Sequence, residues 1–347
     1  MVAGYKFVNK SVVFLLGCVL TVAVNSLLAN ELRPVSISGV VEIEASSSEN
    51  YTGVDSSDIV LATVELGVDA EVAENVSAHI LLLFEEDDSP LEVDEGTISI
   101  SSLGGTPLNL TAGRMYVPFG NFESNMVSDP LTLELAETQE SVVQLGFDIN
   151  GFYGSAYIFN GDSKDSGDED KAKQSGLNLG YVWESEALFF DAGLSYLSSL
   201  ADSDSMQSTV TTVATLADTV SGLGAHGIVS SGAFTVIGEY VTALDKFNAV
   251  DFAFNGRDAK PGAYNLEVAY GLEMASREAT IAVAVQATDE ALTLGLPERR
   301  ALLALNIAVY DNTNIALEWA RDEDYSVRDG GTGMKADKLI AQLAVEF

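Results

Sequence analysis

The sequence predicts an all-β protein, a transmembrane antiparallel β-barrel of about sixteen strands formed by residues 30–347. Three observations predict this fold. Apolar and polar residues alternate with a period of two along the last strand and most of the chain before it. Long and short connections alternate between these segments. After the N-terminal region, no run of about 20 apolar residues could form a transmembrane helix.

The N-terminal region has the order of charges and apolar residues of a secretory signal peptide. Lys6 and Lys10 precede the apolar run 12–24, and Ala29 ends a segment suited to cleavage. We therefore predict that residues 1–29 are a signal peptide and exclude them from the fold. The sequence around Cys18 also fits a lipoprotein signal, which leaves lipidation as an alternative. Removal of residues 1–29 would leave no cysteine.

The chain that follows this region is strongly acidic. Without Lys6 and Lys10 it has 15 basic residues against 52 acidic ones, a formal charge of −37. Such a charge repels nucleic acid and concentrates cations near the surface. The composition therefore excludes a nucleic-acid partner. It also fits a protein from a saline habitat.

Sixteen segments have the pattern of strands. Asn150-Gly151 joins two of them and is a strong signal for a two-residue hairpin. The segments are residues 35–43, 60–70, 76–84, 93–101, 108–117, 143–149, 152–160, 177–183, 188–197, 222–229, 233–241, 264–273, 280–287, 301–310, 314–320 and 338–347.

The connections begin with a long one after the first strand and then alternate short and long. The short ones are residues 71–75, 102–107, 150–151, 184–187, 230–232, 274–279 and 311–313. The longer ones include residues 118–142, 161–176, 198–221, 242–263 and 321–337. Short turns at one end and long loops at the other are typical of outer-membrane barrels, and an even strand number places both termini at the periplasmic end. About sixteen strands enclose an aqueous lumen, as in porins.

The last strand predicts how the barrel meets the membrane. Its apolar face consists of Leu339, Ala341, Leu343, Val345 and Phe347. A terminal Phe suits the level of the lipid headgroups, so we expect outer-membrane lipid as a partner and the bacterial outer membrane as the location. The strand also resembles the C-terminal signal that outer-membrane proteins present to the barrel-assembly machinery. An ordinary edge strand of a soluble sheet is the alternative.

If the apolar positions meet lipid, the alternate positions face the lumen. A charge on the lipid face would cost about 2–4 kcal/mol for Arg or Lys and less for an acid. Two interpretations follow, a pore wall that attracts cations and simple hydration of a wet interior. The acidic candidates are Glu42, Glu44, Glu65, Asp191, Glu239, Glu267 and Glu318.

Residues 113–138 are the most distinctive stretch. Pro118 ends a strand, because proline cannot donate to the ladder. A bulge at Gly113 would turn Arg114 and Tyr116 inward and leave Met115 against lipid together with Val117. We expect residues 130–138 to be a loop that folds into the lumen. Its acids Glu134 and Glu137 would then oppose Arg114, either at a constriction or as a structural salt bridge.

This stretch resembles a known family. Gly-Arg-Met-Tyr-Val-Pro-Phe-Gly at 113–120, Asp-Pro-Leu-Thr-Leu-Glu-Leu at 129–135 and the Glu-Thr that follows are similar to the LbtU-like siderophore porins, outer-membrane barrels linked to legiobactin uptake. The resemblance implies passage of an iron chelate without a plug domain. Ferric complexes of carboxylate siderophores are anionic, however, and this chain is very acidic.

The sequence therefore predicts a porin-like channel for uptake of a small solute, with a ferric siderophore as one candidate. The alternatives are a general diffusion porin that prefers cations and a structural or adhesive barrel. We expect no enzyme, cofactor or metal site, although Ser77 near His79 leaves a hydrolase as a remote alternative to be tested at His79 and His226. Monomer and trimer both remain open.

Overall fold

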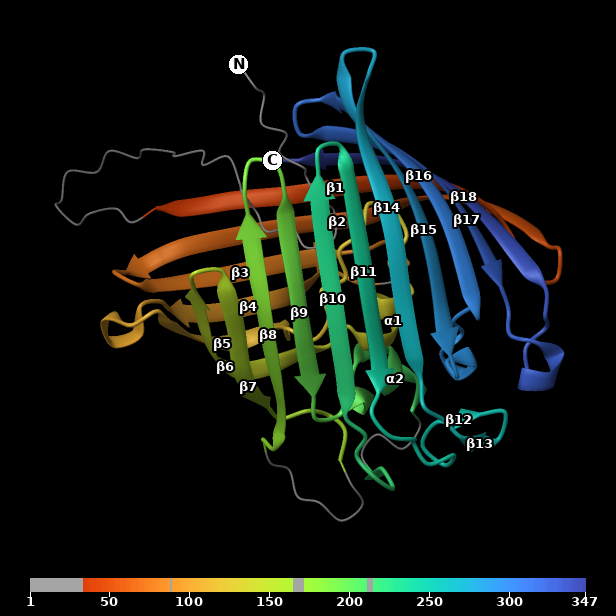
Figure 1. Ribbon diagram of the computed structural model, residues 1–347, viewed down its shortest axis with the longest axis horizontal. Coiled ribbons are helices and arrows are strands. Elements are labelled where there is room, and N and C mark those ends of the chain that lie inside the picture. Colours follow the sequence, from red (N-terminus) through yellow and green to blue (C-terminus); the bar gives the residue numbers. More distant parts are fainter. Residues whose placement is uncertain (1–33, 88, 165–171, 211–214) are drawn as a thin grey trace.

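The computed structural model describes residues 34–87, 89–164, 172–210 and 215–347. Within these residues, sixteen antiparallel strands form one closed barrel, which confirms the predicted fold class (Figure 1). Neighbours in the barrel are neighbours along the chain, except that β11 pairs with β14, and the last strand pairs with the first. The predicted signal peptide and Cys18 lie outside the described residues, so these remain predictions.

The barrel strands are β1 (Val35–Glu49), β2 (Asp55–Ala73), β3 (Val76–Phe84), β4 (Glu92–Ile100), β5 (Leu108–Tyr116), β6 (Gln139–Ile149), β7 (Phe152–Phe159), β8 (Gln174–Glu184), β9 (Phe189–Leu197), β10 (Gly222–Ser231), β11 (Phe234–Ala243), β14 (Gly262–Met274), β15 (Arg277–Asp289), β16 (Arg299–Tyr310), β17 (Thr313–Glu323) and β18 (Lys335–Glu346).

Smaller elements lie in the connections. A two-stranded sheet, β12 (Ala253–Phe254) and β13 (Arg257–Asp258), lies between β11 and β14. The helices are α1 (Leu131–Ala136), α2 (Asp204–Thr209) and the single-turn helices η1 (Leu103–Gly105), η2 (Leu200–Asp202), η4 (Leu292–Leu294) and η5 (Val327–Asp329). None of the helices in the described residues is long and apolar enough to cross a membrane.

The alternation of loop lengths is confirmed in most of the barrel but not at its start. Asn150 and Gly151 both have positive φ, as a two-residue hairpin turn requires. The connection predicted at 44–59 is wrong, because β1 and β2 continue to within five residues of each other. Their extensions carry polar residues on both faces, and Ser48 Oγ lies 2.9 Å from Ser56 Oγ. A hairpin in water is not constrained to the period-two pattern, so residues 44–59 carry no strand signal.

The last residue closes the barrel. The backbone N–H of Gly39 donates to the carbonyl of Phe347 (2.9 Å), and the N–H of Phe347 donates to the carbonyl of Gly39 (3.0 Å). The Phe347 ring lies over Gly39, where a Cβ atom would come within 2.5 Å of it. The predicted apolar face of β18 points outward, and Phe347 itself is 58% exposed.

The outer surface has an apolar band between two sets of aromatic residues. At the short-turn end, the Phe152 ring lies tilted beside Tyr181 and the Phe234 ring beside Tyr270, with ring centroids 4.6 and 4.8 Å apart. Exposed Leu and Val side chains occupy the alternate positions between the two sets. Two aromatic girdles around an apolar band are the surface of a barrel in a bilayer. The long-loop end carries Tyr196, Tyr240, Tyr264 and Trp319.

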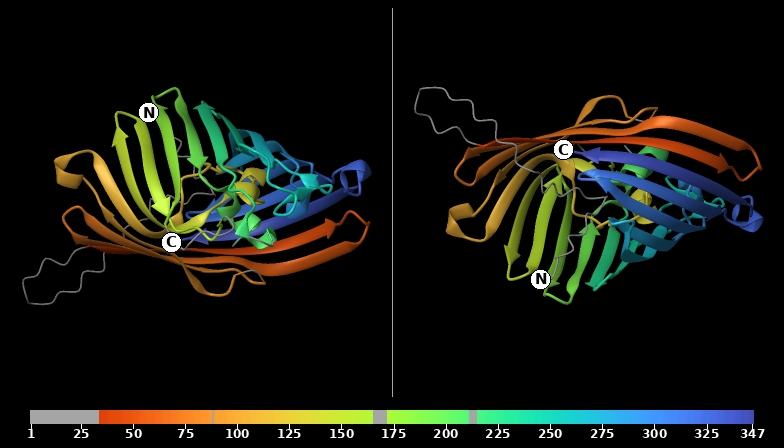
Figure 2. Two further views of the ribbon diagram at one scale, coloured as in Figure 1. Left: turned by 90° about the horizontal axis from the view of Figure 1, so that it is seen from below. Right: turned by 90° about the horizontal axis from the view of Figure 1, so that it is seen from above.

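The buried apolar residues lie mainly inside the barrel at the long-loop end. Three long connections fold inward there and pack together against strands β6, β7 and β11 (Figure 2). The cluster includes Phe119, Leu131, Leu135, Val142, Tyr157, Phe159, Leu200, Met206, Val241, Phe247 and Phe252. The lumen at this end is therefore partly filled by a well-packed core.

Candidate functional site

The candidate site is the space inside the barrel beside the segment 117–138, here called the infolded loop. The N–H of Val117 donates to the carbonyl of Thr138 (2.9 Å), so a narrow neck joins the loop to β5 and β6. Gly120 and Phe122 have positive φ, which turns the chain into the lumen. Pro130, predicted to be in a loop, precedes the short helix α1, and Leu131 and Leu135 are fully buried. The expected inward folding of residues 130–138 is thus what the structure contains.

Three carboxylates hold the infolded loop against one wall of the barrel. Glu239 on β11 accepts from the N–H groups of Asn121 (2.6 Å) and Phe122 (3.2 Å). The hydroxyl of Thr132 in α1 donates to the second oxygen of Glu239 (2.7 Å). This single side chain therefore fixes both the start of the loop and its helix.

The second carboxylate is Glu267 on β14. It accepts from the hydroxyl of Ser124 (2.8 Å) and from the N–H of Asn125 (2.9 Å). The side-chain amide of Asn125 adds a third bond of 2.6 Å. Glu267 is fully buried, and these donors supply the stabilisation that a buried carboxylate requires.

The third carboxylate is Glu318 on β17. It accepts from the N–H of Val127 (2.6 Å) and from the hydroxyl of Ser128 (2.6 Å). The loop therefore presents donors every three residues, at 121–122, 124–125 and 127–128, to carboxylates on successive parts of one wall. We call β11, β14, β15, β16 and β17 the anchored wall.

Amide and guanidinium side chains complete the anchored wall. The side-chain amide of Asn306 donates to the carbonyl of Asn125 (2.8 Å), and Gln286 accepts from the N–H of Leu131 (3.2 Å). Arg300 makes a two-pronged ion pair with Asp322, at 2.8 and 3.1 Å. These residues were not among the predicted site residues, because an inward polar side chain on a strand gives no sign of which loop it contacts.

A second connection covers the end of α1. The N–H of Asp204 donates to the carbonyl of Glu137 (2.9 Å). The hydroxyls of Ser203 and Ser205 donate to the carbonyls of Leu135 (2.9 Å) and Glu134 (2.5 Å). Residues 203–205 thereby satisfy carbonyls that the helix leaves unpaired. The infolded loop is thus held from both sides.

A second wall, formed by β1 to β4, carries inward acids that are only partly buried; we call it the open wall. Glu42 and Glu44 share the amide of Gln342 on β18, at 3.3 and 2.8 Å. Glu65 is inward as well, since it pairs with the inward residue Val40 across the ladder. These carboxylates are half-buried and meet the lumen.

His79 lies among further acids of the open wall. Its Nδ1 lies 2.8 Å from a carboxylate oxygen of Asp69, and its Nε2 lies 3.9 Å from Glu95. The imidazole nitrogens therefore lie beside carboxylates, and in the strand ladder Ser77 is opposite Glu71 and Ser99. Among the described residues, no group of three or more metal-binding side chains is assembled.

The infolded loop turns acids of its own toward the lumen. Asp129 is exposed, and Glu134 and Glu137 are half-buried. Burial and the charges of Asp204 and Asp129 raise the pKa of Glu137 to about 8. Desolvation and the charge of Glu134 raise the pKa of Asp129 to about 7, and the charges of Glu85 and Glu44 act in the same direction. Acids therefore lie on both sides of the passage.

The strand register around Arg114, and the faces on which its neighbours lie, differ from the prediction. The pairing of β5 with β4 and β6 runs through Gly113 without a shift, so the predicted bulge is absent from this register. Gly113 is required for another reason, since a Cβ atom there would lie 2.0 Å from the carbonyl of Gly96. Met115 packs against the inner apolar cluster and Val117 belongs to it, so the prediction that these two meet lipid is wrong.

Arg114 and Tyr116 lie on the other face of β5 from Met115 and pair with Ser141 and Gln139 on the outward face of β6. The prediction that these two side chains turn into the lumen is therefore wrong. The guanidinium of Arg114 donates to the side chain of Gln139 (2.8 Å) rather than meeting Glu134 and Glu137. The amide of Gln139 and the hydroxyl of Tyr116 both donate to Asp94, at 2.6 and 3.3 Å. The negative charge of Glu134 acts instead on Arg300 of β16. Arg114 thus belongs to a network that joins β4, β5 and β6.

The remaining predicted acid, Asp191, faces the lumen from β9. It accepts from the hydroxyl of Tyr153 (2.8 Å), and His226 Nε2 lies 3.7 Å away. Glu123 of the infolded loop lies close to this group, and one of its oxygens is buried without a hydrogen-bond partner. Burial, with the charges of Asp191 and Glu267, raises the pKa of Glu123 to about 7.

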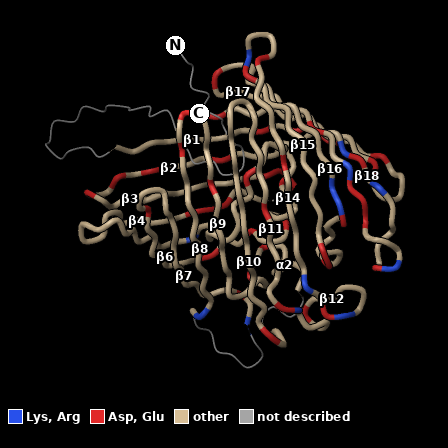
Figure 3. Tube along the Cα trace, in the orientation of Figure 1, with Lys and Arg blue, Asp and Glu red and all other residues tan. Residues whose placement is uncertain are grey.

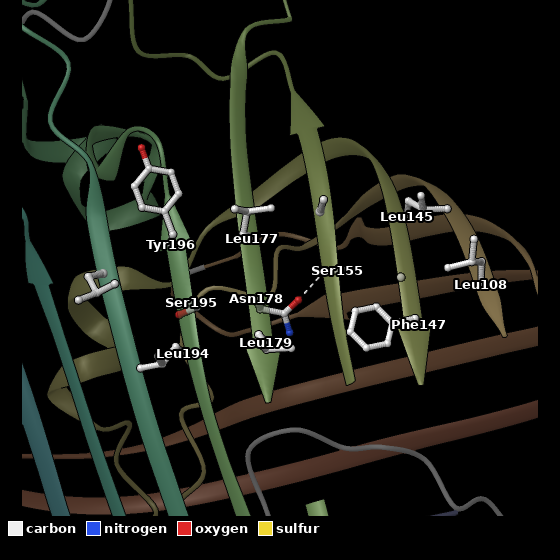
Figure 4. A pocket seen from close by; sticks show the side chains of 13 residues that line it. Leu108, Leu145, Phe147, Ser155, Leu177, Asn178, Leu179, Leu194, Ser195 and Tyr196 are labelled. Carbon is white, nitrogen blue, oxygen red and sulfur yellow. Dashed lines mark hydrogen bonds between the residues drawn. The ribbon is translucent and has the colours of Figure 1, made fainter. Parts of the chain in front are cut away.

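A separate depression of about 530 Å³ lies over strands β6 to β9 (Figure 4). Its exposed leucines belong to the apolar outer band, and Ser155 donates to the side chain of Asn178 behind them (2.6 Å). The depression therefore lies where lipid chains cover the barrel, away from the lumen. The leucines that line it include Leu145, Leu177, Leu179 and Leu194.

Comparison with known proteins agrees with this architecture. The outer membrane channel DcaP of Acinetobacter baumannii has a TM-score of 0.64 at 13% identity, covering 91% of this chain and 97% of that one. An anion-selective porin from Comamonas acidovorans has a TM-score of 0.61 at 14% identity, covering 91% and 100%. These likenesses concern the fold. No protein-family model matches the sequence.

Sequence relatives are more informative about descent. A UPF0422 protein of Legionella pneumophila (strain Lens) is 31% identical over 90% of this chain and 66% of its own length. A UPF0422 protein of Coxiella burnetii is 29% identical over 90% of this chain and 70% of its own length. The chain thus spans about 66% of the Legionella relative. It is a homologue of the UPF0422 proteins, folded as a closed sixteen-strand porin-like barrel that points to the bacterial outer membrane.

Proposed function

We propose that the protein is an outer-membrane channel whose passage runs between the infolded loop and the open wall and favours small cations. The observation that carries this proposal is the presence of acids on both sides of that passage, with Asp129 on the loop and Glu42, Glu44 and Glu65 on the wall. Acidic side chains around a pore attract cations and repel anions. The formal charge of −35 on the full sequence has the same sign.

The two arginines nearest to the infolded loop support the same direction of selectivity. Arg300 is neutralised by its two-pronged pair with Asp322. Arg114 donates to Gln139, at the neck of the loop. Neither offers a cluster of positive charge comparable with the acids of the open wall.

Reversal potentials in planar bilayers across a salt gradient test the proposal. We expect cation preference that is strongest at low salt, because the Debye length falls from about 30 Å at 0.01 M to about 3 Å at 1 M. Anion preference would refute the acidic passage, and the absence of conductance in repeated insertions would refute the channel.

Uptake of a ferric siderophore is the finer alternative, and it rests on the resemblance of residues 113–138 to siderophore porins. An anionic chelate would need a local positive charge, for which Arg114 is the candidate from that stretch. Uptake of radiolabelled iron chelate by cells with and without the protein distinguishes the two. Equal uptake in both cells would leave small cations as the solute.

A further inference from the structure

Basic residues are concentrated in one part of the barrel, β16 to β18 with their connecting loops. Residues 299–338 contain six of the 15 basic residues that follow the predicted signal peptide, together with seven acids. The other residues from 30 to 347 contain nine basic residues and 45 acids. This stretch is therefore close to neutral in a chain that is otherwise strongly negative, and Figure 3 shows blue segments gathered on β16 and β18.

Three of these bases point away from the lumen at the long-loop end. Arg299 and Lys335 have side chains 69% and 57% exposed, and Arg321 is 47% exposed. They lie on adjacent strands, since Arg299 pairs with Glu323 across the ladder and Glu323 pairs with Lys335. We call Arg299, Arg321 and Lys335 the outer basic surface.

An aromatic residue places this surface at a defined depth. The guanidinium of Arg321 lies 5.3 Å from the ring centroid of Trp319, an outward residue of the aromatic girdle. Arg321 is two positions closer to the long-loop end of β17, where the strand leaves the hydrocarbon. Aromatic girdles of membrane barrels lie at the headgroup level. The outer basic surface therefore lies at or just above the headgroups on the long-loop side.

Each base has an acidic neighbour, but these pairs are exposed. Arg321 pairs with Asp337 (2.8 Å), Lys335 with Glu323 (3.7 Å) and Arg299 with Glu298 (3.9 Å). Exposed ion pairs contribute little free energy. A phosphate can therefore replace or bridge such partners at low cost, and arginine is well suited to the exchange because its planar fork matches phosphate oxygens.

We propose that the outer basic surface binds the phosphate groups of lipopolysaccharide, the phosphorylated glycolipid of the outer leaflet. The position at the headgroup level and the local absence of net negative charge support this partner. Elsewhere the acidic rim repels lipid phosphate, so the glycolipid would be held mainly along β16 to β18. The proposal requires only that the long loops face outward, and it does not depend on the channel's selectivity.

The test measures binding of purified lipopolysaccharide to the folded barrel in detergent, by native mass spectrometry or microscale thermophoresis. The variant combines Arg299→Gln, Arg321→Gln and Lys335→Gln. We expect affinity at least about tenfold lower, since a basic residue near an anionic lipid surface contributes about fivefold in affinity. Arg277→Gln is the matched control, because Arg277 also lies over an outward aromatic ring, Tyr310 at 5.5 Å, but at the short-turn end.

Several results would overturn the proposal. These are unchanged affinity in the triple variant, an equal loss in the Arg277→Gln control, or equal binding of wild type to dephosphorylated lipopolysaccharide. Binding of inorganic phosphate that lipopolysaccharide does not displace would show a free-ion site and not a lipid site. If the triple variant does not fold, as judged by heat-modifiable mobility on gels, the dephosphorylated glycolipid still decides the question with the wild-type protein.

Discussion

The two walls of the lumen carry the same chemical group in opposite surroundings. On the anchored wall, Glu267 and Glu318 are 0% and 1% exposed, and every bond they accept in this region comes from the infolded loop. On the open wall, Glu42 and Glu44 are half-buried and share one amide from Gln342. The comparison shows that an inward acid in this barrel can be a structural anchor or a charge facing the passage, depending only on whether a loop lies over it.

The energetics of the two walls differ accordingly. A buried carboxylate is tolerated only if donors satisfy it, and the loop supplies three donor pairs for three carboxylates. A hydrated carboxylate needs no such partner, but its field extends into the passage over the Debye length. Substitutions on the two walls should therefore have different effects, one on structure and the other on selectivity.

The largest effect is expected on the anchored wall. Glu267→Ala removes the acceptor for Ser124 and Asn125 and leaves these donors buried. Docking of the infolded loop should weaken by about 3 kcal/mol, on the order of a hundredfold in the docked population. Single-channel recording should then show new conductance levels, and limited proteolysis should cut within residues 117–138.

Glu44→Ala on the open wall is the matched control for this substitution. It removes a carboxylate that accepts from Gln342, and we expect the wild-type conductance levels and protease resistance. If Glu267→Ala behaved like Glu44→Ala, the distinction between the walls would fail.

A smaller effect is expected for selectivity. Glu44→Gln combined with Glu65→Gln removes two acidic groups from the open wall and retains side-chain volume. The ratio of cation to anion permeability should fall about two- to fivefold at low salt, and less at 1 M salt, because screening already weakens the field. Reversal potentials measure the change. An unchanged ratio would mean that the passage does not follow the open wall.

The sequence predicted the strand count and the last strand because lipid imposes a period of two on every crossing segment. It failed where that constraint ends. The extensions of β1 and β2 beyond residues 43 and 60 lie past the apolar band, and their polar faces resembled a loop.

The inside of the barrel was harder to predict. Inward acids were recognised by alternation, but the role of Glu239, Glu267 and Glu318 depends on a loop more than 100 residues away in sequence. The mistaken bulge at Gly113 had a different cause. A glycine within a strand signals close approach of a backbone as readily as a bulge, and the contact with Gly96 shows which applies here.

The pH dependence of loop docking should reveal the contribution of Glu137, an acid of the infolded loop itself. The pKa of Glu137 is raised to about 8 by burial and by Asp204 and Asp129. The docked loop therefore holds this proton more tightly than a released loop, for which the pKa would be near 4.5. Docking is strongest below pH 4.5 and weakens as the pH rises toward 8. Glu137→Gln should flatten this dependence, as measured by proteolysis of the loop between pH 5 and 9. An equal slope in the variant would exclude Glu137 as the source.

The smallest structural effect is expected for Arg114→Ala. Arg114 lies at the neck of the infolded loop, on β5, which belongs to neither wall. Arg114 is exposed and donates to Gln139, so its loss should cost less than about 1 kcal/mol and should leave the docked loop in place. Gln139 would still donate to Asp94 and hold β6 beside β4. Conductance and cation preference should therefore match the wild type.

Uptake of a radiolabelled ferric chelate is the decisive second measurement, since a charge that attracts an anionic solute is needed only for that solute. Uptake that falls several-fold while conductance is unchanged would assign Arg114 to chelate binding. Unchanged uptake through the variant protein would show that Arg114 has only a structural role at the neck.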